Sequence, residues 1–358
     1  MSTCLGLYIE NNIIKYAKVS KDNDNIKVDS FGMKFYDKLN EAIGEGSKKT
    51  FNEVEGVNNP QLTNEMVPVK WDSNSSKWVV TTVDDQDWYN YTNKQWANVM
   101  LRDGLEVEGI INTSTATIDE MKGKNITSEG SMFVWIPRYA YKIESGYHKN
   151  GTDINSTKIE LGRGNISVTF LKGTTDKPVD NVTIVEYNKT TTEEYTKFPN
   201  GYVVHPAFSY GTRISGIWVA KFEASSAEGN SNNKQGDDVN TKTLQVKPGV
   251  QSWRYITANN AYDVCLEYNK QLNSHLIKNS EWGAALYLTY SKYGKNDTVW
   301  KNPNKNYITG QAGTSANATH TDTTYTYTNT EYGVEASTTG NIYGIYDMHA
   351  GAWEMVAA

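Results

Sequence analysis

The sequence predicts an α+β protein with few helices and much irregular loop, preceded by a β-meander. Short segments rich in Val, Ile, Trp and Tyr recur along the chain between Asn-, Ser-, Thr- and Gly-rich stretches, which is typical of strands joined by turns. The two clearest helices are expected at 258–272 and 280–293, where apolar residues recur at helical spacing. Polar, glycine-rich stretches such as 225–245 indicate exposed loops.

The composition argues against several classes of partner. The 358 residues carry a net charge of −6, and no block of Lys or Arg occurs. A nucleic-acid partner is not expected, because neutralising phosphates needs a concentrated basic face. No apolar run reaches the ~18 residues of a membrane helix, so membrane insertion is not expected either. The 24 Tyr and 10 Trp suit a β-rich protein whose aromatic residues fill a core or contact a ligand.

Residues that carry chemistry are scattered. The two cysteines, Cys4 and Cys265, are far apart in sequence, and Cys265 lies on the apolar stripe of segment 258–272. A buried cysteine there behaves as a small hydrophobic residue and not as a nucleophile. The five histidines show no metal-ligand spacing. The residues themselves therefore indicate no enzyme.

We expect residues 1–43 to form a small ββ(β)α module and residues 44–58 to form a linker. Strands are expected at 4–9, 12–19 and 26–31, and a helix from 36 to 43. The first two strands resemble the opening β-hairpin of actin-like ATPases of the cell-division and pilus-assembly type. Tyr8 and Glu10 stand where that family has an Asp and a Gly in its first phosphate loop, so we assign no nucleotide site.

Residues 59–130 predict a β-meander region built from two hairpins. The first hairpin pairs 67–71 with 78–81 around a turn that begins at Asp72, and the second pairs 88–91 with 96–100. Two interpretations are open for the tryptophans of these hairpins, contact with a carbohydrate or packing within the meander, and packing is favoured. These tryptophans are Trp71, Trp78, Trp88 and Trp96.

Residues 131–358 predict the main domain. Strands are expected at 131–143, 201–208 and 216–223. Pro137 marks a strand edge or bulge within the first of these. The third is apolar on both faces at first, which indicates a central strand. In helix 280–293, Asn279 or Ser280 is the expected N-cap.

The last nineteen residues, 340–358, form the most distinctive stretch of the chain. Glycines at 340, 344 and 351 alternate with large apolar residues, which predicts a tightly coiled, buried segment. The run Gly-Asn-Ile-Tyr-Gly-Ile-Tyr-Asp-Met, followed by Ala-Trp-Glu at 352–354, resembles the signature of the formylglycine-generating-enzyme/sulfatase-modifying-factor family. That family shares its core with the C-type-lectin-like fold.

Four upstream blocks fit this resemblance in order. They are Phe133–Pro137, Ile217–Ala224, Ser252-Trp253 leading into Asn260–Tyr268, and His275–Ala285. The resemblance spans residues 131–358 and implies a C-type-lectin-like, formylglycine-generating-enzyme-like domain.

The resemblance also implies a class of function. Members that oxidise cysteine to formylglycine use a cysteine pair well after the Ala-Trp-Glu block, and this sequence ends at Ala358, five residues after Trp353. Non-catalytic proteins on this fold include phage tail and surface adhesins and the variable proteins of diversity-generating retroelements. We therefore expect a non-enzymatic protein, displayed on a virion or bacterial surface, that binds a protein or glycan receptor. No signal peptide is visible.

Two alternatives remain open at this point. One is a truncated formylglycine-generating-type oxidase whose cysteines are encoded beyond Ala358. The other is a filament or pilus-associated component, which the likeness of residues 1–43 suggests. The sequence predicts no particular oligomeric state.

Two sets of site residues follow from the resemblance and from the composition of the loops. Aromatic residues near the tail are the expected ligand contacts: Tyr325, Tyr327, Tyr332, Tyr343, Trp253 and Trp300. The resemblance further implies calcium, held by the Glu354 carboxylate and the backbone carbonyls of Ala352 and Ala350, which is suitable chemistry for a hard cation. The alternative is that Glu354 pairs with an Arg or accepts backbone N–H groups.

Overall fold

The protein divides into two compact units, Met1–Thr50 and Phe51–Ala358, which are described separately. The computed structural model describes residues 2–10, 13–22, 25–35, 56–144, 148–149, 152–153, 165–187, 199–209, 211–228, 243–302, 307–312, 323–349, 351–352 and 354–357. The expected helix at 36–43 and most of the expected linker at 44–58 lie outside these residues.

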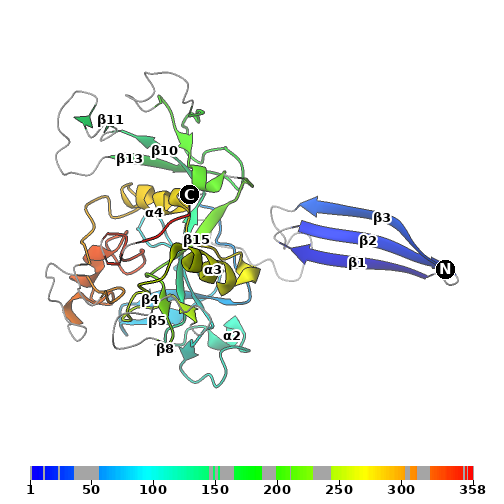
Figure 1. The fold of residues 1–358 in the computed structure, drawn as a ribbon, viewed down its shortest axis with the longest axis horizontal. Helices are drawn as coiled ribbons and strands as arrows, with labels where there is room; N and C mark the ends of the chain where they lie inside the picture. The colour runs from blue at the N-terminus through cyan, green and yellow to red at the C-terminus, as the bar shows by residue number, and fades with distance from the viewer. Residues whose placement is uncertain are drawn as a thin grey trace. The chain divides into compact units, whose positions relative to one another are not determined.

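The first unit contains a three-stranded antiparallel sheet in the order β1-β2-β3 (Figure 1). Its strands are β1 (Ser2–Glu10), β2 (Ile13–Asp22) and β3 (Asn25–Phe35). Strand β2 pairs with β1 without interruption, and its pairing with β3 shifts register between Lys18 and Val19. The three strands expected here are confirmed.

The second unit is built on a five-stranded antiparallel sheet in the order β15-β9-β6-β4-β5. The strands are β4 (Met66–Asp72), β5 (Lys77–Val80), β6 (Asn98–Leu101), β9 (Met132–Pro137) and β15 (Gly216–Ala220). Strands from both sides of residue 130 thus share one sheet. The central-strand interpretation of 216–223 is wrong: β15 lies at the edge, and its second apolar face packs against other parts of the fold.

A second antiparallel sheet, in the order β13-β10-β14, continues from the first. Its strands are β10 (Tyr139–Ile143), β13 (Ile166–Phe170) and β14 (Val203–Val204). The chain passes from β9 to β10 at Pro137, where the sequence predicts a strand edge. Three two-stranded ribbons complete the β-structure: β7 (Glu106–Val107) with β8 (Ile126–Ser128), β11 (His148–Lys149) with β12 (Thr152–Asp153), and β16 (Ser225–Ser226) with β17 (Leu244–Gln245).

Helices are few. They are α2 (Ile118–Met121), α3 (Ala258–Tyr268) and α4 (Asn279–Thr289), with short 3₁₀ turns at Pro206–Phe208, Lys270–Leu272, Thr323–Tyr325 and Gly333–Ala336. Both expected helices are confirmed, although each ends before the predicted residue. None of these helices in the described part of the chain is both long and apolar enough to cross a membrane.

The N-terminus of α4 corrects one expectation. The N-cap is Lys278 and not Asn279 or Ser280, because the Glu281 carboxylate accepts the Lys278 backbone N–H at 2.9 Å and closes the first turn from inside the helix. Helix α4 buries Ala284, Ala285 and Leu288 and packs against β13 and β15 (Figure 1).

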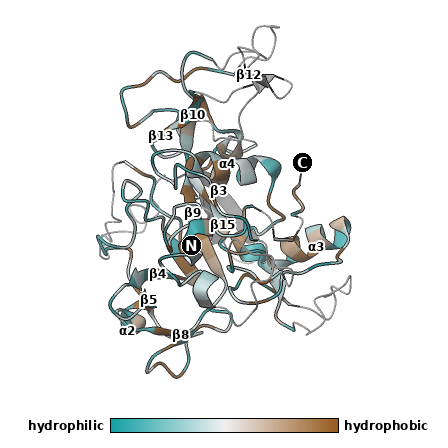
Figure 2. Cartoon of the chain, turned by 90° about the vertical axis from the view of Figure 1, so that its left-hand side faces the viewer, coloured by the Kyte–Doolittle hydropathy of each residue, from teal (hydrophilic) through white to brown (hydrophobic). Residues whose placement is uncertain are grey.

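The core consists of two hydrophobic clusters, and strongly hydrophobic residues lie along β9 and β15 (Figure 2). Helix α4 packs on the first cluster, and the C-terminal coil 340–348 contributes Ile345 and Met348 to the first cluster and Ile342 and Tyr346 to the second. Trp88 and Trp96 belong to the first and are fully buried, with their indole N–H groups donating to the carbonyls of Asn98 and Tyr293 at 3.0 and 2.8 Å. The packing interpretation is confirmed for these two tryptophans.

The C-terminal coil is buried at 342 and at 344–348, as the sequence predicts, but the prediction of burial is wrong for Glu354, Met355 and Val356, which are exposed. Lys221, which follows β15 and has no exposed surface, donates from its ammonium group to the carbonyls of Ile342 and Gly344, both at 2.7 Å. A Cβ at Gly344 would lie 2.7 Å from the Thr339 amide nitrogen and closer still to the Ser337 hydroxyl. The coil therefore requires glycine at this position.

Two glycine-to-alanine changes test this packing with the same chemical alteration. We expect Gly344→Ala to lower the free energy of unfolding by about 1–3 kcal/mol, because the new methyl group overpacks the coil. Gly283→Ala should raise it by about 0.5–1 kcal/mol, because glycine is unfavourable within helix α4. The added Cβ would meet only His205, at 3.8 Å from Nε2. Denaturant unfolding measures both, and a Gly344→Ala protein as stable as the parent would contradict the close packing.

Candidate ligand-binding site

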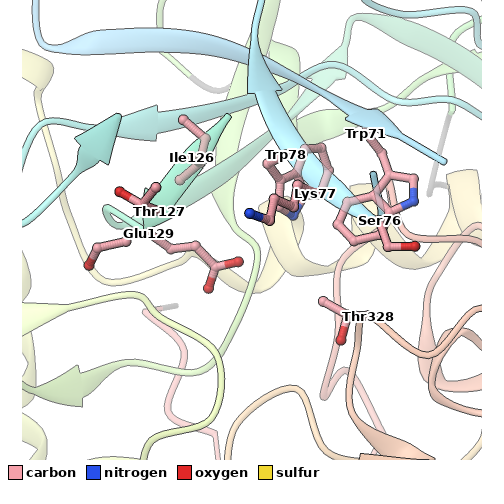
Figure 3. Close-up of a pocket in the computed structure, with 9 residues that line it drawn as sticks. Trp71, Ser76, Lys77, Trp78, Ile126, Thr127, Glu129 and Thr328 are labelled. Carbon is pink, nitrogen blue, oxygen red and sulfur yellow. The ribbon is translucent and has the colours of Figure 1, made fainter. Parts of the chain in front are cut away.

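A pocket of about 290 Å³ opens beside the β4–β5 hairpin. It is lined by Trp71, Ser76, Lys77, Trp78, Ile126, Thr127, Ser128, Glu129 and Thr328. Figure 3 places Trp71 and Thr328 on one side and Ile126, Thr127 and Glu129 on the other, with Lys77 and Trp78 between them. The pocket thus combines an aromatic wall with hydroxyl, ammonium and carboxylate groups.

The aromatic wall follows from the local sequence of the hairpin. Trp71 and Trp78 are register partners on β4 and β5, so their side chains share one face of the sheet. Their rings meet edge to face with centroids 5.6 Å apart. The Asp72 carboxylate fixes the connecting turn by accepting the N–H groups of Asn74 and Ser75 at 3.0 and 3.2 Å. The predicted first hairpin is confirmed.

The second predicted hairpin is only partly present. Residues 88–91 and 96–100 are joined by a single bridge between Asn90 and Gln95, and only β6 forms a strand. The aromatic residues of 88–91 are fully buried and turn into the first cluster, so burial overrides the strand pattern there.

Two of the predicted contact tyrosines support the pocket from behind. The Tyr343 hydroxyl accepts the Trp71 backbone N–H at 3.2 Å, and its ring meets Trp78 edge-on at 5.7 Å. The Tyr327 hydroxyl accepts the Trp78 indole N–H at 3.1 Å and donates to Glu129 Oε1. Tyr327 is only 5 % exposed. Both tyrosines fix the groups that line the pocket.

Glu129 is the carboxylate of the pocket, and its environment is unusual. Burial raises its pKa, while the hydrogen bond from Tyr327 and the positive charges of Lys221 and Lys247 act in the opposite direction. The Lys221 ammonium also lies over the Trp78 ring, 5.3 Å from its centroid. Burial holds the pKa of Lys221 well below its ordinary value, although Glu129 acts to raise it.

The other predicted contact residues lie elsewhere. Tyr325 and Tyr332 form an edge-to-face pair with centroids 6.2 Å apart, and Tyr332, at 40 % exposure, is the most accessible of the six. Trp253 is buried, and the half-buried Trp300 packs against the second cluster. Sequence reasoning did not select Glu129, Lys77 or Thr328. The pair Trp71 and Trp78 was the available signal, since one of its two interpretations was contact with a carbohydrate.

The predicted calcium ligand Glu354 lies near two other carboxylates, those of Glu223 and Asp347. The Glu354 carboxylate accepts the Trp282 indole N–H at 2.7 Å, and the Ala352 N–H donates to Glu223 at 2.9 Å. Ala350 lies outside the described residues. Across those residues, no group of three or more His, Cys, Asp or Glu side chains is arranged to hold a metal ion. Calcium stays a prediction.

Loss of hydration raises the pKa of each of these three carboxyl groups, and repulsion from neighbouring carboxylates adds to it for Glu354 and Glu223. Loss of hydration around the carboxyl group and then the Asp347 charge raise the pKa of Glu354 to about 7, although the residue itself is exposed and the Trp282 hydrogen bond opposes the shift. Burial alone raises the pKa of Asp347 to about 6, and burial, Asp347 and Glu354 together raise that of Glu223. A proton or another positive charge would therefore stabilise this group of carboxylates.

Cys265 has the character expected of a packing residue. Its thiol is free and half-buried, and burial raises its pKa to about 11. A thiol with this pKa is almost entirely protonated near neutral pH, so it is a poor nucleophile. The Cys4 side chain lies outside the described residues.

Comparison with known proteins gives no match: no protein-family model, curated protein or solved structure is similar to this chain.

A pair of hydroxyl deletions tests how the pocket is held. We expect Tyr327→Phe to lower the free energy of unfolding by about 1–3 kcal/mol, because the buried Trp78 indole N–H loses its acceptor and Glu129 loses its donor. Tyr332→Phe removes a hydroxyl from an exposed tyrosine and should change the free energy of unfolding by less than about 0.5 kcal/mol. Equal effects of the two changes in chemical unfolding would show that the Tyr327 hydroxyl does not support the pocket.

Proposed function

We propose that this chain is a non-enzymatic binding protein displayed on a virion or bacterial surface, and that its receptor enters the pocket beside the β4–β5 hairpin. The observation that carries the proposal is an aromatic wall with polar groups converging on it. Ligand sites are typically concave, lined by aromatic side chains, and given orientation by a few placed polar groups. Trp71, Glu129 and Thr328 supply these features here.

The rigidity of the pocket supports a binding role. Trp71 is fixed by its cross-strand partner and by Tyr343, and Glu129 is fixed by Tyr327. A ligand that enters such a site orders few side chains, so little of its interaction energy is lost to conformational entropy. The described contacts thus favour a preformed site.

The contacts of the C-terminal coil support the C-type-lectin-like scaffold that we propose for residues 131–358. Two blocks of the resemblance, 217–224 and 340–358, meet in the structure. Lys221 binds two carbonyls of the coil, and Glu223 accepts the Ala352 N–H. The resemblance is an analogy at the level of the fold, and the function is argued from the pocket.

A pair of alanine variants tests the proposal. Trp71→Ala removes the half-exposed part of the wall and should weaken binding to receptor-bearing cells by ~30-fold, which corresponds to about 2 kcal/mol for a contact at the centre of a site. Tyr332→Ala is the matched control, because it removes an exposed aromatic residue that does not line the pocket.

Flow cytometry of the labelled protein on panels of bacterial and animal cells measures both variants, after circular dichroism has shown that each is folded. Full binding by Trp71→Ala would remove the pocket from the proposal. If Tyr332→Ala alone lost binding, the receptor surface would instead be the tyrosine pair near the tail.

We also propose that calcium binds at the carboxylates near the end of the chain. The pH dependence of calcium binding and of stability gives a test. The folded pKa values of Glu354 and Asp347, about 7 and about 6, lie above their ordinary values. The folded state then holds protons that the unfolded state has released, so stability falls as pH rises from ~4 to ~7. Calcium binds the ionised carboxylates and should raise the melting temperature at pH 8, relative to chelator, but not at pH 5.

Glu354→Gln is the matched variant, because its amide oxygen can still accept the Trp282 indole N–H while the charge is lost. We expect this variant to lose most of the calcium-dependent rise at pH 8. Identical melting temperatures of the parent protein in calcium and in chelator at pH 8 would exclude the site.

A further inference from the structure

We infer that the pocket beside the β4–β5 hairpin takes one neutral sugar unit of a glycan, stacked on the tryptophan wall and hydrogen-bonded through its hydroxyl groups to Glu129. This inference rests on the proposed binding function and names the chemical class of the ligand.

The pocket presents both apolar and polar groups, and this combination limits the chemical class of the ligand. A purely apolar group would cover Trp71 but would remove water from Glu129, whose carboxylate keeps only the Tyr327 hydroxyl as a partner on Oε1, and this is costly for a charged group. A sugar ring has an apolar face of C–H groups and an edge of hydroxyl groups. It can therefore cover the indole and satisfy the polar groups at the same time.

The free acceptor on Glu129 points to a ligand that donates hydrogen bonds. Oε1 is engaged by the Tyr327 hydroxyl, which also fixes the plane of the carboxylate. In the described part of the chain, no hydrogen bond occupies the second oxygen, Oε2. An ionised carboxylate accepts hydrogen bonds and does not donate them, so Oε2 can accept a hydrogen bond from a sugar hydroxyl.

The charges around the pocket favour a neutral ligand. The Glu129 charge is opposed by Lys221, which is fully buried, and by Lys247. A ligand carboxylate close to Glu129 would be repelled in a poorly hydrated site. Lys77, the remaining charged residue of the lining, is exposed, so water and salt screen its attraction for an anion.

Lys221 also weakens the case for a cationic sugar. Its ammonium group already lies over the Trp78 ring, so the indole has a cation beside it and gains less from a second one. The volume of about 290 Å³ is at the lower limit of the ~300–1,000 Å³ range of ligand pockets, which suits a single sugar unit of a longer chain.

A printed glycan array tests the inference. It should present terminal neutral hexoses, N-acetylhexosamines, hexosamines and hexuronic acids on identical spacers. We expect binding to neutral terminal sugars and at least tenfold weaker binding to the matching uronic acids. In saturation-transfer NMR with the best soluble sugar, the ring C–H protons should receive the most magnetisation, and Trp71→Ala should abolish the transfer.

Glu129→Gln tests whether the negative charge of Glu129 selects a neutral sugar. The amide keeps an acceptor oxygen but loses the charge, so its hydrogen bond to a sugar hydroxyl is weaker. The variant should therefore bind the neutral sugar about tenfold more weakly, and it should lose the discrimination against the uronic acid because the repelling charge is gone. A purely structural role for Glu129 would lower both affinities together and leave their ratio unchanged. Thr328→Ala, at an exposed position of the lining, gives a second variant if Glu129→Gln does not fold. It should weaken sugar binding without changing the charge preference.

Two negative results are distinguishable. If no sugar on the array binds, but peptides selected from a displayed library bind and are lost in Trp71→Ala, the sugar inference is overturned and the binding function stands. If neither sugars nor peptides bind, and Trp71→Ala keeps full binding to cells, the proposed function of the pocket fails as well.

Discussion

The buried ammonium group of Lys221 is the interaction on which the second unit depends most. A charge removed from water is tolerated only when hydrogen bonds and an opposite charge compensate for the lost hydration. Here two carbonyls of the C-terminal coil accept from it at 2.7 Å, and Glu129 supplies the opposite charge. One side chain therefore connects the end of β15, the glycine-rich coil and the carboxylate of the pocket.

This arrangement makes the pocket an extension of the core. Trp78 has Lys221 over its ring, Tyr343 at its edge and Tyr327 on its indole N–H, and only 2 % of it is exposed. The tryptophan wall of the pocket is thus held by residues up to 272 positions away in the sequence. Such support restricts the motion of the lining groups, which is the condition for a preformed site.

Features that depend on contacts between residues near in sequence could be predicted, and features that depend on distant contacts could not. The β4–β5 hairpin was predictable because Asp72 and the alternation around it act over a few residues, and helix α4 was predictable from its apolar stripe. Glu129 was not, because its Tyr327 partner is 198 residues away and its neighbours, Ser128 and Gly130, are typical of loops. Lys221 did carry a signal, a charged residue directly after the apolar run 216–220, but only the fold shows that its partners are backbone carbonyls.

The same reasoning separates the two tryptophans of the pocket. Trp78 lines the pocket but belongs to the second cluster and is almost fully buried, so its removal would disturb the core and the pocket together. Trp71 is half-buried, and the Tyr343 hydroxyl contacts only its backbone, so its side chain can be truncated with the hairpin intact. If the pocket binds a ligand as proposed, Trp71 and the polar groups around it are therefore the positions at which the site can be altered without loss of the fold.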